Sequence, residues 1–287
     1  SQVTYDWADH IWKKFSTQAQ RAALESFVPT EYDNVYMDSE GFIFTCTTNV
    51  SSNGIKSGED EPIRRLNLMG NNILITNGNF RPIGDIYWGK AGGYDGPSLI
   101  ADVTALENGI YFGIDRVRGR LFAYDTQGNL LYAFGGNGNQ DGYFKRPEAL
   151  EHMGKDLLVL DSQDASFTVF TPTVFGNKIY QAIAEYEKSG ETWREVMNMN
   201  GNYDQAYIGI GRALMRQGEY KEAMKYFRLK WDDDNYSKAF KQYRKDWVEE
   251  HIGWIFLAVF LLFILPMIVG RVKKVKFQID TAEIFKS

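Results

Sequence analysis

The segment TALENGIYFGID (residues 104–115) sets the pattern of the N-terminal half of the chain. An apolar strand leads into a tight polar turn, and a second β-rich strand follows. The same layout recurs in VYMDSEGFIFTCT (35–47) and in ALEHMGKDLLVLD (149–161). Short β-rich runs separated by Gly, Asn and Asp, without a long 3.6-residue period, predict an all-β region over residues 31–177.

Two further segments extend this pattern. RGRLFAYDTQGNLLYAFGG (118–136) and ASFTVFTPTVFG (165–176) each look like an outer hairpin that closes on Gly. Asp115 and Asp161 end equivalent strands and lie 46 residues apart, which is the length of a propeller blade. A polar insertion at 49–62 interrupts the first unit. We therefore expect a degenerate blade repeat with three or four visible blades, too few to close a ring alone.

The stretch GGNGNQDGYFKRPEAL (135–150), followed by a strand, an Asp and FTVF, resembles the NHL-repeat family of β-propellers. Phe144 matches the aromatic position of that repeat, Pro147 the Pro before the inner strand, and Asp161 the Asp after the second strand. The resemblance implies a partial, NHL-like β-propeller and a mainly β fold for this part of the chain.

The period becomes helical over residues 178–250. NYDQAYIGIGRALMRQGEYKEAMKYF (202–227) resembles a tetratricopeptide repeat, a helix pair in which small residues allow close approach. Gly218 and Tyr220 mark the turn between the paired helices. Residues 179–198 are expected to add a helical pair, and residues 236–250 a last helix. The signature positions are Tyr207, Gly211, Gly218, Tyr220, Ala223 and Phe227.

IGWIFLAVFLLFILPMIVG (252–270) carries no charge. As a helix it would extend about 28 Å, close to the roughly 30 Å of bilayer hydrocarbon, so residues 251–270 are predicted to span the cell membrane once. Trp247 and Trp254 suit the headgroup level at its N-terminal end. The tail 271–287 begins with a basic cluster, which by the positive-inside rule places it in the cytoplasm and the large N-terminal part outside. The cluster comprises Arg271, Lys273, Lys274 and Lys276.

Residues 1–30 contain TYDWADHIWKKFSTQAQRAALESF (4–27), which is predicted to form an amphipathic helix that packs beside the propeller. The chain begins at Ser1 without Met and without the apolar run of a secretory signal. We therefore expect a fragment of a longer bacterial membrane protein, with blades missing at the N-terminal side.

Composition and motifs argue against several function classes. The formal net charge of −5 gives no field that attracts nucleic acid. Cys46 is the single cysteine, and the chain has three histidines, so neither a disulfide framework nor a His-based catalytic metal is expected. No nucleophile elbow or phosphate-binding loop is present. The chain is predicted not to be an enzyme and to need no cofactor.

One loop has the spacing of a calcium site. Residues 137–148 offer oxygen ligands in an EF-hand-like order, but the glycine-rich link between two blades explains the same residues and is the favoured interpretation. We therefore predict no metal. The candidate ligands are Asn137, Asn139, Asp141 and Glu148, with Gly142 at the turn.

The remaining candidates for a functional site are surfaces that could recognise a ligand or partner. Aromatic side chains in loop-like segments could stack on sugars or contact a protein, and a helical repeat offers a second concave surface. The aromatic candidates are Tyr87, Trp88, Tyr94 and Tyr143. The predicted function is a membrane-anchored, extracytoplasmic scaffold that recruits a protein or a glycan, and the resemblance implies an association with nutrient transport.

Two alternatives stay open. One is a lactonase-like propeller hydrolase or lyase, which would use His152 and channel carboxylates to hold a metal. The other is a purely structural membrane organiser.

Overall fold

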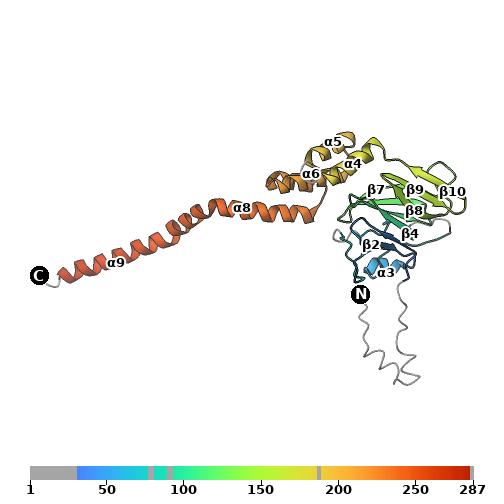
Figure 1. The fold of residues 1–287 in the computed structure, drawn as a ribbon. Coiled ribbons are helices and arrows are strands. Elements are labelled where there is room, and N and C mark those ends of the chain that lie inside the picture. The colour runs from blue at the N-terminus through green and yellow to red at the C-terminus, as the bar shows by residue number, and fades with distance from the viewer. Residues whose placement is uncertain (1–30, 77–80, 89–92, 186–188, 285–287) are drawn as a thin grey trace, which may run out of the picture. The chain divides into compact units, whose positions relative to one another are not determined.

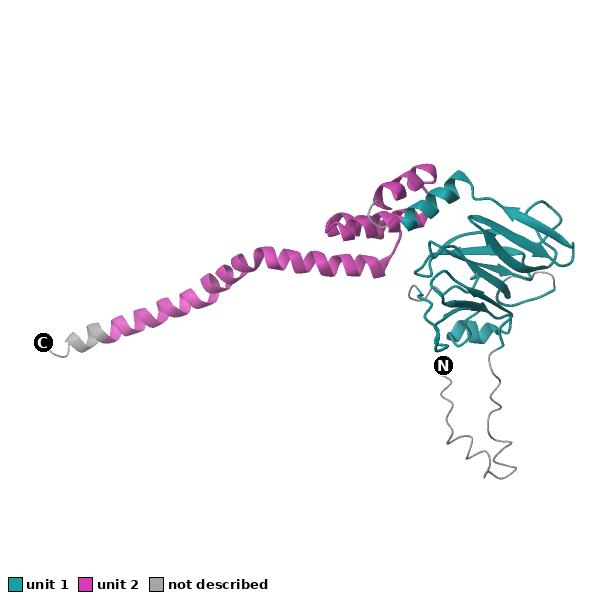
Figure 2. Ribbon diagram, viewed as in Figure 1, with its two compact units in different colours: residues 1–184 teal, residues 185–287 magenta. Residues whose placement is uncertain are grey.

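The computed structural model describes residues 31–76, 81–88, 93–185 and 189–284 (Figure 1). The chain divides into two compact units, residues 1–184 and residues 185–287, which Figure 2 colours separately. Sheets dominate the first unit and helices the second. The amphipathic helix predicted at 4–27 lies outside the described residues.

The strands of the first unit form three small antiparallel sheets, each with its strands in chain order. All three predicted hairpins are confirmed, because the first two strands of every sheet pair antiparallel. The first sheet holds β1 (Asn34–Met37), β2 (Ile43–Cys46) and β3 (Ile63–Leu66). The second holds β4 (Ile100–Ala105), β5 (Tyr111–Asp115), β6 (Arg120–Tyr124) and β7 (Leu130–Gly135). The third holds β8 (Pro147–Met153), β9 (Asp156–Asp161) and β10 (Ser166–Phe170).

The second and third sheets repeat one another in register. Ile100 pairs with Asp115 and Pro147 pairs with Asp161, and both first strands shift register directly afterwards. Each of the two buried carboxylates accepts backbone N–H bonds from the segment that enters its own sheet. Burial by itself would raise the pKa of Asp161, but backbone N–H donors led by that of Lys145 outweigh it and hold the pKa below its usual value. Asp115 and Asp161 therefore each link the end of the second strand of their sheet to the segment that leads into the first strand.

The third sheet lacks the predicted outer hairpin. Residues 165–176 form only β10, and the chain then enters helix α4 (Val174–Ala184). Pro172 has no N–H for a strand ladder, and the Thr173 hydroxyl accepts the Gly176 N–H at 3.2 Å, which caps the helix. The prediction of a second outer strand was wrong because these residues favour a helix start. In the first sheet, the insertion 49–62 contains the short helix α3 (Ser52–Ser57).

The sheets pack in chain order through their first strands. β4 contacts β1 and β2, and β8 contacts β4 and β5 in the same manner. Every residue of β4 and β5 is buried, because this middle sheet is covered on both faces. The core between the first two sheets includes Phe44, Cys46, Ile63, Ile100 and Tyr111. The sheets formed by the described residues do not close into a ring.

Asp102, in the first strand of the second sheet, hydrogen-bonds to the first strands of the other two sheets. Its carboxylate accepts the Leu150 backbone N–H of the third sheet at 2.6 Å and the Val103 N–H at 2.7 Å. The side chain of Asn34 in the first sheet also hydrogen-bonds to it. Burial outweighs these bonds and raises the pKa of Asp102 to about 6. The seam between three sheets therefore holds a carboxyl group that titrates in mildly acidic solution.

The stability contribution of Asp102 is expected to fall as the pH rises from about 4 to about 6. The folded pKa lies above the unfolded value of about 3.9, so the folded chain binds the extra proton in this window. The contribution is fully present below pH 4, and about 3 kcal/mol is lost once the pH has risen through 6. Urea unfolding of the chain and of Asp102→Asn, at several pH values, would measure it. Equal pH slopes for both proteins would contradict the expectation.

The second unit begins with three short helices, α5 (Ser189–Met199), α6 (Asp204–Arg216) and α7 (Tyr220–Leu229). Successive helices contact one another, and α7 also contacts the helix that follows it. The predicted turn between two helices at Gly218 is confirmed, since Gly218 has a φ of +81°. The stretch 179–198, predicted to add a helical pair, contains most of α4 in the first unit and nearly all of α5 in the second.

One helix continues through the predicted span. It consists of α8 (Asp233–Val259), a π-helical turn η1 (Phe260–Ile264) and α9 (Leu265–Ile284). The helical segment Asp233–Gln278 is 46 residues long, and its most apolar window has a mean hydropathy of 2.8 with none of its residues buried. The prediction of one helix long and apolar enough to cross a membrane is confirmed. The π turn lies directly before Pro266, where the Leu265 N–H bonds the Phe260 carbonyl and relieves the clash of the proline ring.

Candidate functional site

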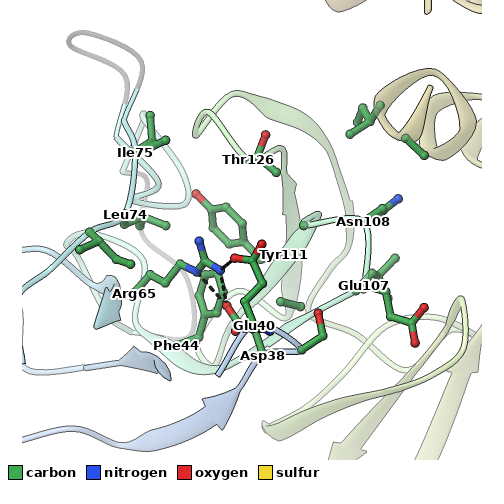
Figure 3. A pocket seen from close by; sticks show the side chains of 17 residues that line it. Asp38, Glu40, Phe44, Arg65, Leu74, Ile75, Glu107, Asn108, Tyr111 and Thr126 are labelled. Carbon is green, nitrogen blue, oxygen red and sulfur yellow. Dashed lines mark hydrogen bonds and ion pairs between the residues drawn. The ribbon is translucent and has the colours of Figure 1, made fainter. Parts of the chain in front are cut away.

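A cavity of about 480 Å³ opens among the hairpin turns of the first unit. The β1–β2 turn, the β4–β5 turn and the β6–β7 turn all contribute to its lining, as does the last turn of α4. Figure 3 shows the labelled side chains that surround it. A cavity of this size is in the usual range for small-molecule sites. We refer to it as the turn cavity.

A carboxylate–arginine cluster forms one wall of the turn cavity. The Arg65 Nε donates to Asp38 Oδ2 at 2.8 Å, and its guanidinium also pairs with Glu40 (Figure 3). The Asp38 carboxylate shapes the turn at the same time, because it accepts the backbone N–H groups of Glu40 and Phe42. The guanidinium carbon lies 4.6 Å from the centre of the Phe42 ring. The cluster is therefore held in place before any ligand arrives.

Tyr111 supplies an unusual polar group to the lining of the turn cavity. Its side chain lines the turn cavity and is 1% exposed, and its hydroxyl has no hydrogen-bond partner among the described residues. Burial raises the pKa of Tyr111 well above its usual value. The neighbouring Tyr124 is also buried, but its hydroxyl accepts the Gly84 N–H at 3.0 Å. An unpaired buried hydroxyl lowers the free energy of unfolding by about 1–3 kcal/mol. The Tyr111 hydroxyl is therefore able to form a hydrogen bond that the described residues do not supply.

The charges around the turn cavity are unbalanced. Three carboxylates, from Asp38, Glu40 and Glu107, face one guanidinium from Arg65. Asn108 and Thr126 add neutral polar groups, and aromatic and aliphatic side chains form the rest of the wall. A neutral or cationic ligand fits this balance, whereas an anionic ligand would be repelled.

The aromatic residues predicted as a binding surface do not line the turn cavity. Tyr87 is exposed in the loop before β4. The Trp88 indole N–H donates to the Asp85 carbonyl oxygen at 2.8 Å, and the Lys56 ammonium lies 5.4 Å from the centre of a Trp88 ring. Tyr87 therefore offers a free ring, while Trp88 is partly engaged.

Tyr94 and Tyr143 lie against glycines. A Cβ on Gly96 would stand 2.6 Å from the Tyr94 hydroxyl, and a Cβ on Gly136 would stand 2.5 Å from the Tyr143 ring. The Tyr94 ring also lies 5.9 Å from the Arg118 guanidinium carbon. These contacts place the two tyrosines on separate links between strands. The contacts of the described residues do not gather the four predicted aromatic residues into one site.

Other contacts occupy the loop considered for calcium. The Asn137 side-chain amide donates to the Val117 carbonyl at 3.2 Å. Glu148 pairs with Arg116 at 2.8 Å and with Arg146 at 2.7 Å. His152, considered for a catalytic metal, has its Nδ1 3.0 Å from the Thr104 hydroxyl. Within the described ranges, no group of three or more His, Cys, Asp or Glu side chains is arranged to bind a metal ion.

The helical-repeat positions meet at the contact between α6 and α7. A Cβ on Gly211 would lie 2.5 Å from the Phe227 ring, and Phe227 and Ala223 are fully buried. The Tyr207 hydroxyl donates to the Gly201 carbonyl at 2.8 Å. Tyr220 is the first residue of α7. Gly211, Ala223 and Phe227 therefore form the contact between the two helices.

The turn cavity was not predicted from the sequence. Its main side chains come from separate hairpins, at Asp38, Arg65, Glu107 and Tyr111. One signal was available, since β3 reads IRRL and places Arg65 in the middle of a strand. A charge at such a position needs a partner.

No family model matches the chain, and no match was found among curated proteins. Its function must therefore be inferred from its own residues.

Proposed function

We propose that the chain is a membrane-anchored, non-catalytic binding protein that holds a glycan in the turn cavity of its first unit. We refer to this first unit, residues 1–184, as the head. The unpaired hydroxyl of Tyr111 is the observation that carries this proposal. Carboxylates, a guanidinium, an amide and hydroxyls surround one space. Sugar hydroxyls can donate hydrogen bonds to the carboxylates and accept hydrogen bonds from the guanidinium, the amide and the hydroxyls. A concave site of about 480 Å³ suits a small polar ligand, whereas a protein partner needs a broad surface of roughly 800 Å².

The charge around the turn cavity narrows the glycan class. Three carboxylates against one guanidinium favour neutral or amino-bearing sugars and disfavour uronic acids. Glu107 is exposed at the β4–β5 turn and can meet an amino group without leaving another contact. Glu107→Gln should therefore weaken binding of amino sugars more than binding of neutral sugars.

The proposal extends to the architecture. The sheets are blades of an NHL-like β-propeller, and α4 to α7 are tetratricopeptide-like repeats that recruit a protein partner near a nutrient transport complex. The shared register of the second and third sheets and the close packing at Gly211 support this interpretation. The head lies outside the cytoplasm, as the basic residues after the span suggest. Protease treatment of intact cells that left the head uncut would contradict this orientation.

Tyr111→Phe is expected to weaken glycan binding about tenfold, because one hydrogen bond to the ligand is lost. Stability should stay unchanged or rise by about 1 kcal/mol, because the unpaired hydroxyl is gone. The detergent-solubilised chain would be tested on an array of neutral, amino and uronic-acid oligosaccharides, and urea unfolding would report stability.

Tyr124→Phe is the matched control. It also removes a buried tyrosine hydroxyl, but it leaves the Gly84 N–H unpaired, so stability should fall by about 1–3 kcal/mol. Tyr124 does not line the turn cavity, and glycan binding by the folded protein should persist. Absence of array binding by the unaltered chain, or unchanged binding after Tyr111→Phe, would refute the proposal.

A further inference from the structure

The head contains a second cavity, of about 360 Å³, apart from the turn cavity. Its walls come from β7, from β9 and β10, and from the first half of α4, all labelled in Figure 1. Among the described residues, none lines both cavities. A volume of this size is within the range of small-molecule sites. We call it the aromatic cavity.

Aromatic rings supply most of the lining of the aromatic cavity. The centre of the Phe134 ring lies 5.9 Å from that of Tyr132 and 5.0 Å from that of Phe170, and the Phe170 ring stands edge-on to it at 72°. Rings in such positions hold a further ring by stacking or by edge-to-face contact. The space therefore suits a flat, apolar ligand. The aromatic lining residues are Tyr132, Phe134, Phe170, Phe175 and Tyr180.

The aromatic cavity has one cationic group. Lys155 is the charged residue of the lining, among the residues that the structure describes. It lies in the two-residue turn between β8 and β9, and its ammonium donates to the Asn177 side-chain oxygen of α4 at 3.4 Å. This bond uses one of the three N–H donors of an ammonium, which leaves donors for a ligand.

The two cavities of the head therefore favour ligands of different charge. Three carboxylates and one guanidinium surround the turn cavity, whereas a single ammonium serves the aromatic cavity. Asp156 follows Lys155 directly, but in β9 it precedes the lining residue Leu157 and so points to the opposite face of the sheet. An anionic group on an apolar body fits the aromatic cavity, because the ammonium attracts the charge and the rings accept the body.

A glycine in α4 leaves room for this ligand. Gly176 lines the aromatic cavity and lies in the first turn of the helix, where glycine lowers helix stability by up to about 1 kcal/mol relative to alanine. An added Cβ would lie 3.6 Å from the Pro172 Cβ, which is an ordinary contact. Close packing therefore does not require glycine here, in contrast to Gly211. The missing side chain instead keeps the cavity open.

We propose that the aromatic cavity binds a small carboxylic acid that carries an aromatic ring. The ring lies among the phenylalanine and tyrosine side chains, and the carboxylate accepts a hydrogen bond from the Lys155 ammonium. The binding is reversible and involves no covalent step. The proposal does not depend on glycan binding, because the two sites share no lining residue among those described.

Two probes with the same ring test the charge preference. The chain in lipid nanodiscs is titrated with naphthoate or with the neutral naphthylmethanol in a calorimeter, and empty nanodiscs give the background. Naphthoate should bind about tenfold more tightly than the alcohol, because only the acid forms a charge-assisted hydrogen bond. Lys155→Met keeps the apolar stem and should remove this preference. Lys178→Met removes a charge on α4 outside the lining, and the preference should persist.

A second variant tests the location without removing a charge. Gly176→Leu should fill the aromatic cavity and abolish naphthoate binding while the helix stays folded, because the added Cβ meets no atom closer than 3.6 Å. Gly201→Leu makes the same change in the second unit, where the nearest atom to an added Cβ is 3.9 Å away, and should leave binding intact. Urea unfolding would confirm that both variants fold.

Several results would overturn the proposal. They are no naphthoate binding by the unaltered chain, equal affinity for the acid and the alcohol, or unchanged binding by folded Gly176→Leu. Tighter binding of octanoate than of naphthoate would also overturn it, since an aliphatic chain makes no ring contacts. Tyr111→Phe should leave naphthoate binding unchanged, because Tyr111 lines the turn cavity. This variant separates a failure here from a failure of the glycan site.

Discussion

Replacement of both Leu261 and Leu262 by arginine is expected to release the chain from the membrane. These residues lie in the middle of the predicted span, within the π-helical turn of a segment that buries none of its side chains. An arginine at the centre of a span costs about 2.5–3.5 kcal/mol on the insertion scale, so the pair costs about 5–7 kcal/mol. The fraction of the protein that sediments with membranes after an alkaline wash would measure this effect.

The matching control places two arginines beside the basic cluster. Val272→Arg with Val275→Arg adds the same charge beyond the predicted span, where long cationic side chains can reach the headgroups. This variant should sediment like the unaltered chain. If the Leu261 and Leu262 variant also remained in the washed membranes, another part of the chain would have to hold it there.

Gly211→Val should disrupt the helix packing of the second unit. A Cβ at this position would lie 2.5 Å from the Phe227 ring, closer than real Cβ contacts come, and Phe227 is fully buried. Overpacking of this kind costs about 1–3 kcal/mol or more, and valine is a poorer helix former than alanine. We expect a loss of about 3 kcal/mol in the free energy of unfolding, measured by urea titration with tryptophan fluorescence.

Two variants separate this steric effect from a general intolerance of substitution. Gly201→Val lies in the same unit, where the nearest atom to an added Cβ is 3.9 Å away, so its cost should stay within about 0.5 kcal/mol. Phe227→Leu in the Gly211→Val background should recover part of the lost stability, because the smaller side chain makes room. Additive losses from the two changes would show that the residues do not meet as described.

Local sequence patterns predicted the turns and the apolar helix correctly. The hairpin turns at Asp38 and Asp125 could be predicted because the side chain of each bonds the backbone N–H groups that follow it. The span could be predicted because lipid requires a long uncharged helix. The failure at residues 165–176 came from a competing local signal, in which Pro172 and Thr173 end the sheet and start α4.

The binding surface was predicted less well. Tyr87, Trp88, Tyr94 and Tyr143 share composition and a loop context, but composition cannot specify which loops converge. The turn cavity depends on convergence, since Asp38 and Arg65 meet only through pairing of β2 with β3. The unpaired hydroxyl of Tyr111 is a property of packing between sheets, and no residue near it in the sequence marks it.

Residues close together in the chain fix the short-range features of this protein, which are the hairpins, the helix turn at Gly218 and one apolar helix of membrane length. Each depends on residues within about two turns or one strand pair, where alternation, turn chemistry and hydropathy act directly. The location of the turn cavity and the carboxylates that surround it follow only from the tertiary structure. These features depend on contacts between residues far apart in the chain, and such contacts follow from the packing of whole sheets.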